Sequence, residues 1–370
     1  MVSLRYIIAQ LYDTMNCIRY ISRLGRPDFQ VHLLCHRQLS TSRRHLSNSR
    51  TSYSRHESSS NNNNAPPFYV LFGVGVPAIG ITAASVYAYY NCLDYVPYTN
   101  RKRLLATTQE WEANMGHEQY KALLKQYQGD ILPKDHRASV TVQRVGSRIA
   151  TAAQKCSHDW GMARNKFSTP FTYTVVRSSD ANAFVLPGNH VFVLTGLFKY
   201  CHDEDELASV LGHETAHNIA RHAGERASEG LLMSIIRQLA LILDPSGMLY
   251  ALLIPAEQLF YTLPHSREHE MEADRIGIIL ASEACYDPRA SKRVFSRMKN
   301  DVENEGQPPE FISTHPGYDT RLTLFDQWMP DALKLYNKDN GNKCRAIRDE
   351  MKRARRIAAL MHDGKEGKRR

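Results

Sequence analysis

Residues 203–217 read DEDELASVLGHETAH, with two histidines four positions apart around a glutamate. Asp203 is a good N-cap residue and Glu206 follows three positions later, as in a capping box, so the sequence predicts that a helix begins here. Apolar residues recur at helical spacing and predict a buried face: Leu207, Val210 and Leu211. On such a helix His213 and His217 leave the same side, one turn apart.

This histidine pair is the spacing that a catalytic zinc site uses. Two neutral imidazoles, one carboxylate and a water molecule form the usual set of ligands. Glu214 follows the first histidine, where its carboxylate can take a proton from the metal-bound water. With 16 histidines in 370 residues, a chance HExxH has odds of roughly a few per cent. A third ligand downstream makes coincidence much rarer.

A second predicted helix carries candidates for that third ligand. Residues 266–277 read SREHEMEADRIG, in which Glu270 and Asp274 lie four positions apart on one face. Glu270 fits the third zinc ligand, and Asp274 fits the acceptor that orients a ligating imidazole through its other nitrogen. The rivals in this stretch are Glu268, His269 and Glu272. Glu272 leaves the helix roughly 200° from Glu270, and Glu268 lacks an aspartate four positions later, so spacing favours Glu270.

Further along, Ser-Thr-His-Pro at 313–316 precedes Arg321. We expect His315 to donate a hydrogen bond to the oxyanion of a tetrahedral intermediate. Arg321 is expected to do the same or to hold the substrate carbonyl. The alternative is a loop histidine fixed by Pro316 and an arginine in a surface ion pair.

Two strands are predicted ahead of the zinc helix, at 171–176 and 191–194. Between them, NAFVLPGNH at 182–190 predicts a strand and a tight turn. A strand beside the metal helix can offer an open edge to which a peptide substrate adds as another strand. An ordinary core hairpin explains the spacing equally well. The substrate-binding candidates on this strand are Asn182, Ala183 and Phe184.

The N-terminal part of the chain predicts a targeting segment and a membrane anchor. Residues 1–64 are rich in arginine and serine and poor in acidic residues, which is typical of a mitochondrial transit peptide with a disordered linker. The alternative is a disordered basic tail that carries no targeting signal. Residues 68–90 carry no charge and would reach roughly 34 Å as a helix. This exceeds a hydrocarbon core of about 30 Å, so a single transmembrane helix is predicted, in place of a buried core helix.

Three further regions have a helical pattern. Residues 104–170 are expected to be largely helical, and two apolar stretches, 231–243 and 248–260, are shorter than the roughly 18 residues of a membrane span. We therefore predict buried or interfacial helices at both stretches. The apolar stripe predicted within the first region comprises Val140, Val142, Val145, Ile149 and Ala153.

The chain has a net charge of +9, concentrated near its two ends. No nucleic-acid-binding motif accompanies the basic runs, so nucleic acid is not an expected partner. The basic tail, residues 336–370, is expected either to approach an anionic membrane surface or to be solvated.

Together these motifs resemble the membrane gluzincins, which include the HtpX heat-shock protease and the CAAX prenyl endopeptidase. Within that clan the chain is similar to the mitochondrial inner-membrane metalloendopeptidases whose activity overlaps with the m-AAA protease. The resemblance covers residues 95–330. It rests on HETAH at 213–217, SREHEMEAD at 266–274, STHP at 313–316 with Arg321, NAFVLPG at 182–188 with Gly196 and Leu197, and VPYTNR at 96–101.

The resemblance implies one zinc ion per chain, with His213, His217 and Glu270 as ligands and Glu214 as general base. His315 would stabilise the transition state. It also implies ATP-independent cleavage of inner-membrane proteins in quality control and under stress, including the dynamin-like fusion GTPase. The catalytic domain would face the intermembrane space, and the protein would form homo-oligomers.

The seven cysteines include no CxxC pair, so a cysteine zinc site is not expected. If the domain faces the intermembrane space, Cys285 and Cys344 are the candidate disulfide. Reduced, structural thiols are the favoured alternative.

We therefore predict an α+β, mainly α, metallopeptidase domain at 95–335 with a small sheet edge. Protein substrates and the lipid bilayer are its expected partners. The rival from another class is a membrane-anchored chaperone-like or binding protein with a structural zinc. Glu214 argues against this rival, because zinc binding alone needs no general base.

Overall fold

The computed structural model describes residues 86–162, 170–258, 262–305, 309–315 and 318–338, with 342, 344–349 and 352–353. The predicted leader at 1–64 lies outside these ranges, as does most of the predicted membrane helix, residues 68–85. The chain divides into two compact units, Met1–Cys92 and Leu93–Arg370. Within the described ranges, no helix combines the length and apolarity needed to cross a membrane.

The second unit contains a short ribbon and a small mixed sheet. Strands β1 (Leu93–Tyr95) and β2 (Lys102–Leu104) form an antiparallel pair. The sheet has the order β3-β5-β4, with β5 parallel to β3 and antiparallel to β4. The predicted strands are thus confirmed, and β4 lies at an edge. The bounds are Thr172–Val176 for β3, Ala183–Leu186 for β4 and His190–Leu194 for β5.

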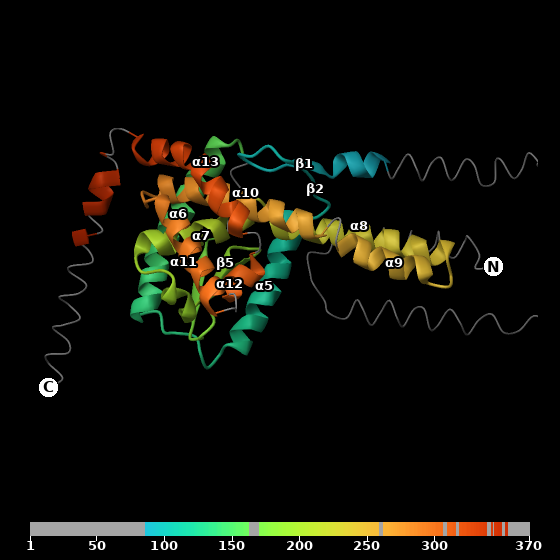
Figure 1. Ribbon diagram of the computed structural model, residues 1–370, viewed down its shortest axis with the longest axis horizontal. Coiled ribbons are helices and arrows are strands. Elements are labelled where there is room, and N and C mark those ends of the chain that lie inside the picture. The colour runs from blue at the N-terminus through green and yellow to red at the C-terminus, as the bar shows by residue number, and fades with distance from the viewer. Residues whose placement is uncertain are drawn as a thin grey trace, which may run out of the picture. The chain divides into compact units, whose positions relative to one another are not determined.

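Helices make up most of the described chain and confirm the mainly α, α+β class (Figure 1). Helices α5 (Gln109–Gln126) and α6 (Arg137–Asp159) precede the sheet, and the 3-10 helix η3 (Thr195–Lys199) follows β5. After it follow α7 (Glu204–Ile219), α8 (His222–Leu243), α9 (Met248–Glu257), α10 (Leu263–Glu283), α11 (Arg289–Glu305), α12 (Glu310–Thr314) and α13 (Tyr318–Tyr336).

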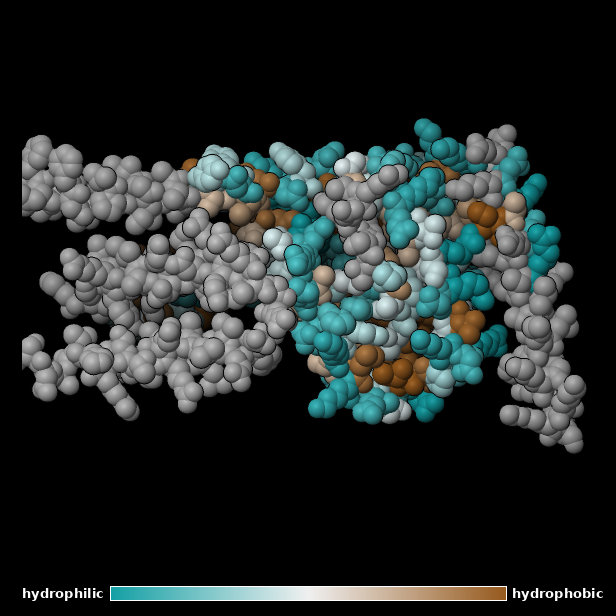
Figure 2. Space-filling view, turned by 180° about the vertical axis from the view of Figure 1, so that it is seen from behind, coloured by the Kyte–Doolittle hydropathy of each residue, from teal (hydrophilic) through white to brown (hydrophobic). Residues whose placement is uncertain are grey.

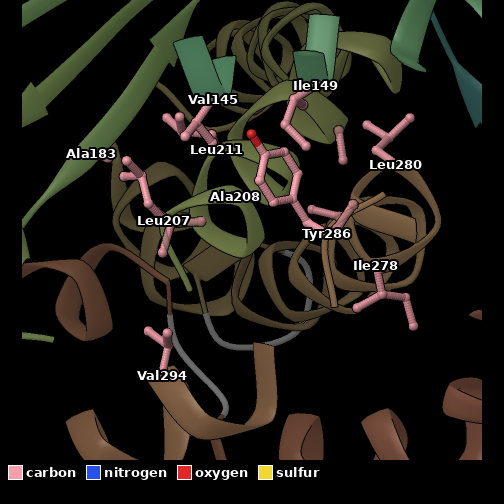
Figure 3. Packing of buried hydrophobic residues seen from close by; sticks show 14 of the residues in the cluster. Val145, Ile149, Ala183, Leu207, Ala208, Leu211, Ile278, Leu280, Tyr286 and Val294 are labelled. Atoms are coloured by element: carbon pink, nitrogen blue, oxygen red, sulfur yellow. The ribbon is translucent and has the colours of Figure 1, made fainter. Parts of the chain in front are cut away.

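Helix α7 is the centre of the core. The predicted cap is confirmed: the Glu206 amide donates to Asp203 Oδ1 at 2.8 Å, and the Glu206 carboxylate accepts from the His202 amide at 2.8 Å. Leu207 and Leu211 are almost fully buried, and each such side chain contributes about 1.5–3 kcal/mol by leaving water. Figure 3 shows Leu211 next to Val145 of α6, and the same cluster includes Ile149 of α6 and Ile278 and Leu280 of α10.

One member of the predicted α6 stripe faces solvent. Val142, Val145, Ile149 and Ala153 are fully buried, whereas Val140 is 44% exposed. Val140 precedes Val142 by two positions, which places it about 200° around the helix from the buried face. Its assignment to the stripe was wrong for this reason.

Two glycines set the distance between α7 and α10. A Cβ atom on Gly212 would lie 2.9 Å from the Gly277 carbonyl oxygen, and one on Gly277 would lie 2.9 Å from the His213 amide nitrogen. Both contacts are closer than carbon atoms tolerate, so the two backbones meet here because neither residue has a side chain. This approach brings the histidines of α7 against the carboxylates of α10.

Residues beyond 335, in the segment predicted to be a basic tail, contact the rest of the second unit. Cys285 and Cys344 form a disulfide that closes 59 residues, so the reduced state is not the one observed. Arg348 donates to the Cys285 carbonyl at 3.2 Å and approaches Asp205 at 3.3 Å. A cross-link of this span stabilises a fold by roughly 4 kcal/mol in the chain-entropy account.

Helices α8 and α9 run side by side away from the rest of the second unit (Figure 1). They confirm helices at the two apolar stretches, 231–243 and 248–260, as far as residue 258. The prediction was buried or interfacial helices, and the structure contradicts the buried alternative. Most of their large apolar side chains are exposed, and no residue of α9 is buried.

Candidate metal centre

Three side chains bring their donor atoms together in a buried cluster formed by α7 and α10. The Nε2 atoms of His213 and His217 are 3.1 Å apart. Glu270 Oε2 lies 3.3 Å from His213 Nε2, and Glu270 Oε1 lies 3.4 Å from His217 Nε2. Tetrahedral zinc with bonds of about 2.0–2.1 Å separates neighbouring ligand atoms by roughly 3.3–3.4 Å. The spacing and the chemistry of this donor set therefore fit one zinc ion.

Among the candidates of the second helix, the structure brings only Glu270 into this cluster. Glu268 is exposed. His269 is buried elsewhere, with Nε2 3.2 Å from Glu225, and Glu272 faces His222. The spacing argument in favour of Glu270 therefore agrees with the three-dimensional arrangement.

An aspartate–arginine pair holds the imidazole of His213. Its Nδ1 lies 2.9 Å from Asp274 Oδ1, which leaves Nε2 facing the cluster. Arg321 donates to both oxygens of Asp274, at 2.6 and 2.8 Å. Burial alone lowers the pKa of His213, but hydrogen bonds to Asp274 and Glu270 outweigh it and raise the pKa to about 9. Asp274 keeps a lowered pKa despite burial, because of Arg321. It is positioned as the predicted orienting acceptor.

His217 has an orienting partner of its own, which the sequence analysis did not identify. Its Nδ1 lies 2.8 Å from His222 Nδ1, and His222 Nε2 lies 3.0 Å from Glu272 Oε2. One tautomer assignment satisfies both contacts: His217 Nδ1–H donates to His222, and His222 Nε2–H donates to Glu272. His217 Nε2 then offers its lone pair to the cluster. Burial holds the pKa of both imidazoles well below the usual value, which favours these neutral forms.

This second chain of contacts continues to the segment after β1. Arg101 donates to Glu272 at 2.9 Å and to Glu225 at 2.6 Å, and Thr99 also hydrogen-bonds Glu272. The sequence signal that could have revealed this contact is the Arg221-His222 pair directly after α7. Arg221 adopts a left-handed backbone conformation with φ 55°, and the turn that results places His222 beside His217.

Glu214 lies between the cluster and strand β4. It is buried, and its Oε2 accepts from the Val185 amide at 3.2 Å. Its Oε1 has no hydrogen-bond partner among the described residues and lies 3.5 Å from His315 Nε2. Burial raises the pKa of this carboxyl group. One oxygen is thus anchored to the sheet, while the other faces the space beside the histidines.

The open edge of β4 presents main-chain groups to the same space. The Leu194 amide donates to the Asn182 carbonyl at 3.0 Å, so alternate residues, including Phe184, bond towards β5. Ala183 and Val185 face outward instead. The Phe184 ring stacks on Phe192 at 5.2 Å, and the side chains of Asn182 and Ala183 are buried. The strand thus has outward main-chain groups, whereas the Asn182 and Ala183 side chains are buried and the half-buried Phe184 side chain packs on Phe192.

His315 and Arg321 both lie at the cluster, in different positions. His315 Nδ1 is 2.8 Å from Glu270 Oε2 and 3.2 Å from His213 Nε2, so its ring spans the space between Glu270 and Glu214. Arg321 is 1% exposed and also donates to the His315 carbonyl at 2.8 Å. Its guanidinium lies behind Asp274. This placement fits a positioning residue better than the substrate contact or surface ion pair considered from sequence.

These features define the HExxH class of metallohydrolases. They are two buried histidines on one helix, a glutamate from a second helix, and beside them a carboxylate with one oxygen that accepts no hydrogen bond from the described residues. The sequence pattern of Peptidase family M48 matches residues 141–329, and the chain belongs to this family. It is a metalloendopeptidase.

The chain is similar to three relatives named as mitochondrial OMA1 metalloendopeptidases. The relative from Schizosaccharomyces pombe is 38% identical over 68% of this chain and 71% of its own length. The relative from Saccharomyces cerevisiae is 31% identical, over 68% of this chain and 73% of its own length. The human relative is 30% identical, over 67% of this chain and 48% of its own length.

Proposed function

We propose that this chain is a zinc-dependent, ATP-independent endopeptidase of the mitochondrial inner membrane. Its substrates would be membrane proteins cleaved in quality control and in stress responses, including a dynamin-like fusion GTPase. The observation that supports this proposal most directly is the buried donor set of His213, His217 and Glu270 at tetrahedral spacing. Glu214 and the open β4 edge lie beside it.

The proposed mechanism assigns one role to each group around the cluster. Zinc, when bound, polarises the scissile carbonyl and acidifies a water molecule. Glu214 takes the proton from that water and later delivers it to the leaving amine. The substrate backbone pairs with the outward groups of Ala183 and with the Val185 carbonyl, because the Val185 amide already donates to Glu214, and His315 donates to the oxyanion. Asp274 and His222 hold the two ligand imidazoles in place.

The proposed location rests on composition and on the names of the relatives. Residues 1–64 have the composition of a transit peptide, and residues 68–90 form the uncharged run assigned to a single membrane span. The relatives are named as mitochondrial enzymes. We place the domain in the intermembrane space, with homo-oligomers, protein substrates and the bilayer as its partners and no nucleic acid.

A second candidate, a chaperone-like or binding protein with a structural metal ion, has one observation in its favour. His315 Nδ1 lies within reach of the same cluster, and a fourth protein ligand closes a structural site. The buried Glu214 carboxylate favours the enzyme, because its Oε1 accepts no hydrogen bond from the described residues and faces the cluster.

Removal and return of the metal test the proposed function. The full chain in detergent should cleave an unfolded protein substrate without ATP, lose this activity in a chelator, and regain it when zinc is added. A parallel sample with ATP and magnesium should cleave at the same rate. Cleavage that survives complete chelation would exclude zinc catalysis. Zinc binding without any cleavage would favour the structural-metal candidate.

Substitution of His222 by alanine is expected to weaken zinc binding about 10–100-fold, as loss of an orienting partner does at other sites. The reason is that His217 loses the acceptor at 2.8 Å that fixes its tautomer. Competition with a zinc chelator measures the affinity without an activity assay. His222→Asn, which keeps an acceptor, should recover part of it. His202→Ala is the control, because His202 is exposed at the start of α7. Equal affinities in the wild type and His222→Ala would contradict the role.

A further inference from the structure

The hairpin of α8 and α9 carries a large apolar surface that no described residue covers. Leu243 is 78% exposed, Met248 68% and Leu252 62%. By contrast, hydrophilic side chains cover much of the globular part on the face shown in Figure 2. The other exposed apolar residues of the hairpin are Leu231, Ile235, Ile236, Leu239, Leu241, Ile242, Leu249 and Ile254.

The apolar surface surrounds α8, whereas a surface helix normally has a single apolar stripe. Consecutive residues Leu241, Ile242 and Leu243 are all exposed, so they point in three directions about 100° apart. Ala240 is the buried residue in the second half of the helix. A helix that is apolar all round belongs in a protein core or in lipid.

The charged groups in the apolar part of the hairpin, residues 230–258, have their partners within the hairpin itself. Between 230 and 258 they are Arg237, Asp244 and Glu257. Arg237 and Glu257 form an ion pair at 2.5 Å between the two helices. Asp244 accepts from the Ser246 and Leu249 amides, at 3.0 and 2.8 Å, and so caps the turn. Internal pairing of this kind is what a hydrocarbon environment demands, because lipid offers no hydrogen-bond partner.

The first turns of α8, which form the root of the hairpin, contact the β1–β2 ribbon that follows the predicted membrane helix. The Ala106 amide donates to Ser228 Oγ at 2.8 Å, and Arg101 pairs with Glu225. The ribbon begins at Leu93, three positions after the uncharged run ends at residue 90. The start of α8 contacts this ribbon, and the ribbon follows the uncharged run directly in sequence. Its two strands have three residues each, so only a short stretch of chain separates the end of the run from the residues that contact α8.

We propose that the α8–α9 hairpin inserts into one leaflet of a lipid bilayer. Its apolar part on α8, residues 231–243, is about 20 Å long, which is shorter than the roughly 30 Å of a hydrocarbon core. The hairpin therefore enters, turns at residues 244–247 and returns without crossing. Because the zinc helix ends at Ile219 and α8 begins at His222, insertion sets the active site beside the membrane surface.

Quenching of tryptophan by brominated lipid tests the insertion. The full chain carrying Ile242→Trp is reconstituted into phosphatidylcholine vesicles, with and without bromine on the acyl chains. Val140→Trp is the matched control, because Val140 is 44% exposed on α6 and Ile242 is 46% exposed on α8. The wild-type signal is subtracted from both. We expect the added fluorescence at 242 to be mostly lost in brominated vesicles and that at 140 to be unchanged.

Equal quenching at the two positions, or none at 242, would overturn the proposal. If a second copy covers the hairpin, the Ile242→Trp variant stays unquenched while cross-linking between copies at this position rises with protein concentration. A further variant, Leu239→Glu with Ile242→Glu, should reduce cleavage of a membrane-anchored substrate and leave cleavage of a soluble peptide unchanged. Loss of both activities would indicate damage to the catalytic domain, and equal cleavage of both substrates by variant and wild type would overturn the proposal. The lipid test does not depend on the metal.

Discussion

Replacing Glu214 by glutamine is expected to lower kcat by about 10²–10⁴-fold, the usual contribution of a positioned general base. Glutamine has the same shape and can still accept from the Val185 amide through its carbonyl oxygen. It cannot take a proton from water. Because Glu214 is not one of the three side chains that supply the donor atoms, the zinc content should stay at the wild-type level. Peptide hydrolysis and metal analysis on the same preparation measure the two quantities.

The control for this variant is Glu118→Gln on α5. The Glu118 side chain is 53% exposed and pairs only with Lys121 among its described contacts. This variant should keep the wild-type kcat. Hydrolysis by Glu214→Gln at a rate close to the wild type would remove Glu214 as the general base, and loss of zinc from that variant would make it a ligand.

Replacing Arg321 by methionine is expected to destabilise the domain by about 3–5 kcal/mol, the usual result of removing one member of a buried ion pair. Arg321 is 1% exposed and donates twice to Asp274, and its Nη1 lies 3.3 Å from Glu270. Without it, two carboxylates stay buried beside each other with less positive charge around them. The free energy of unfolding, measured with denaturant in a chelator, tests this without a contribution from the metal.

Arg293→Met is the control for charge removal at a half-exposed site. Arg293 is 43% exposed and lies 3.2 Å from Glu206. The Glu206 carboxylate is buried but keeps a second ion pair with Arg297 at 3.0 Å, so this variant should lose only about 0–1 kcal/mol. Equal losses of stability for the two variants would show that Arg321 does not stabilise the buried carboxylates of Asp274 and Glu270.

The parts of the site that could be predicted from sequence depend on local spacing. The i, i+4 relation fixes His213 against His217 and Glu270 against Asp274 once each segment is a helix. The N-cap at Asp203 and the turn after Leu186 are equally local. These predictions needed no knowledge of how α7 packs against α10.

The missed parts depend on contacts between distant segments. His222 reaches His217 only because Arg221 turns the chain, and Glu272 was excluded as a ligand without a view of its partner His222. Whether Ala183 or Phe184 faces a substrate depends on the pairing of β4 with β5, which composition does not specify. The exposure of α8 and α9 follows from the direction in which the hairpin leaves the domain.

The most direct test of the central claim is the zinc content of matched glutamate variants. Glu270→Gln removes the carboxylate 3.3–3.4 Å from both histidine nitrogens, whereas Glu268→Gln changes an exposed residue two positions away on the same helix. Elemental analysis after equilibrium with a weak chelator should find one zinc per chain in the wild type, in Glu268→Gln and in His315→Ala, and much less in Glu270→Gln. Full zinc in Glu270→Gln, or loss of zinc in Glu268→Gln instead, would contradict this metal centre.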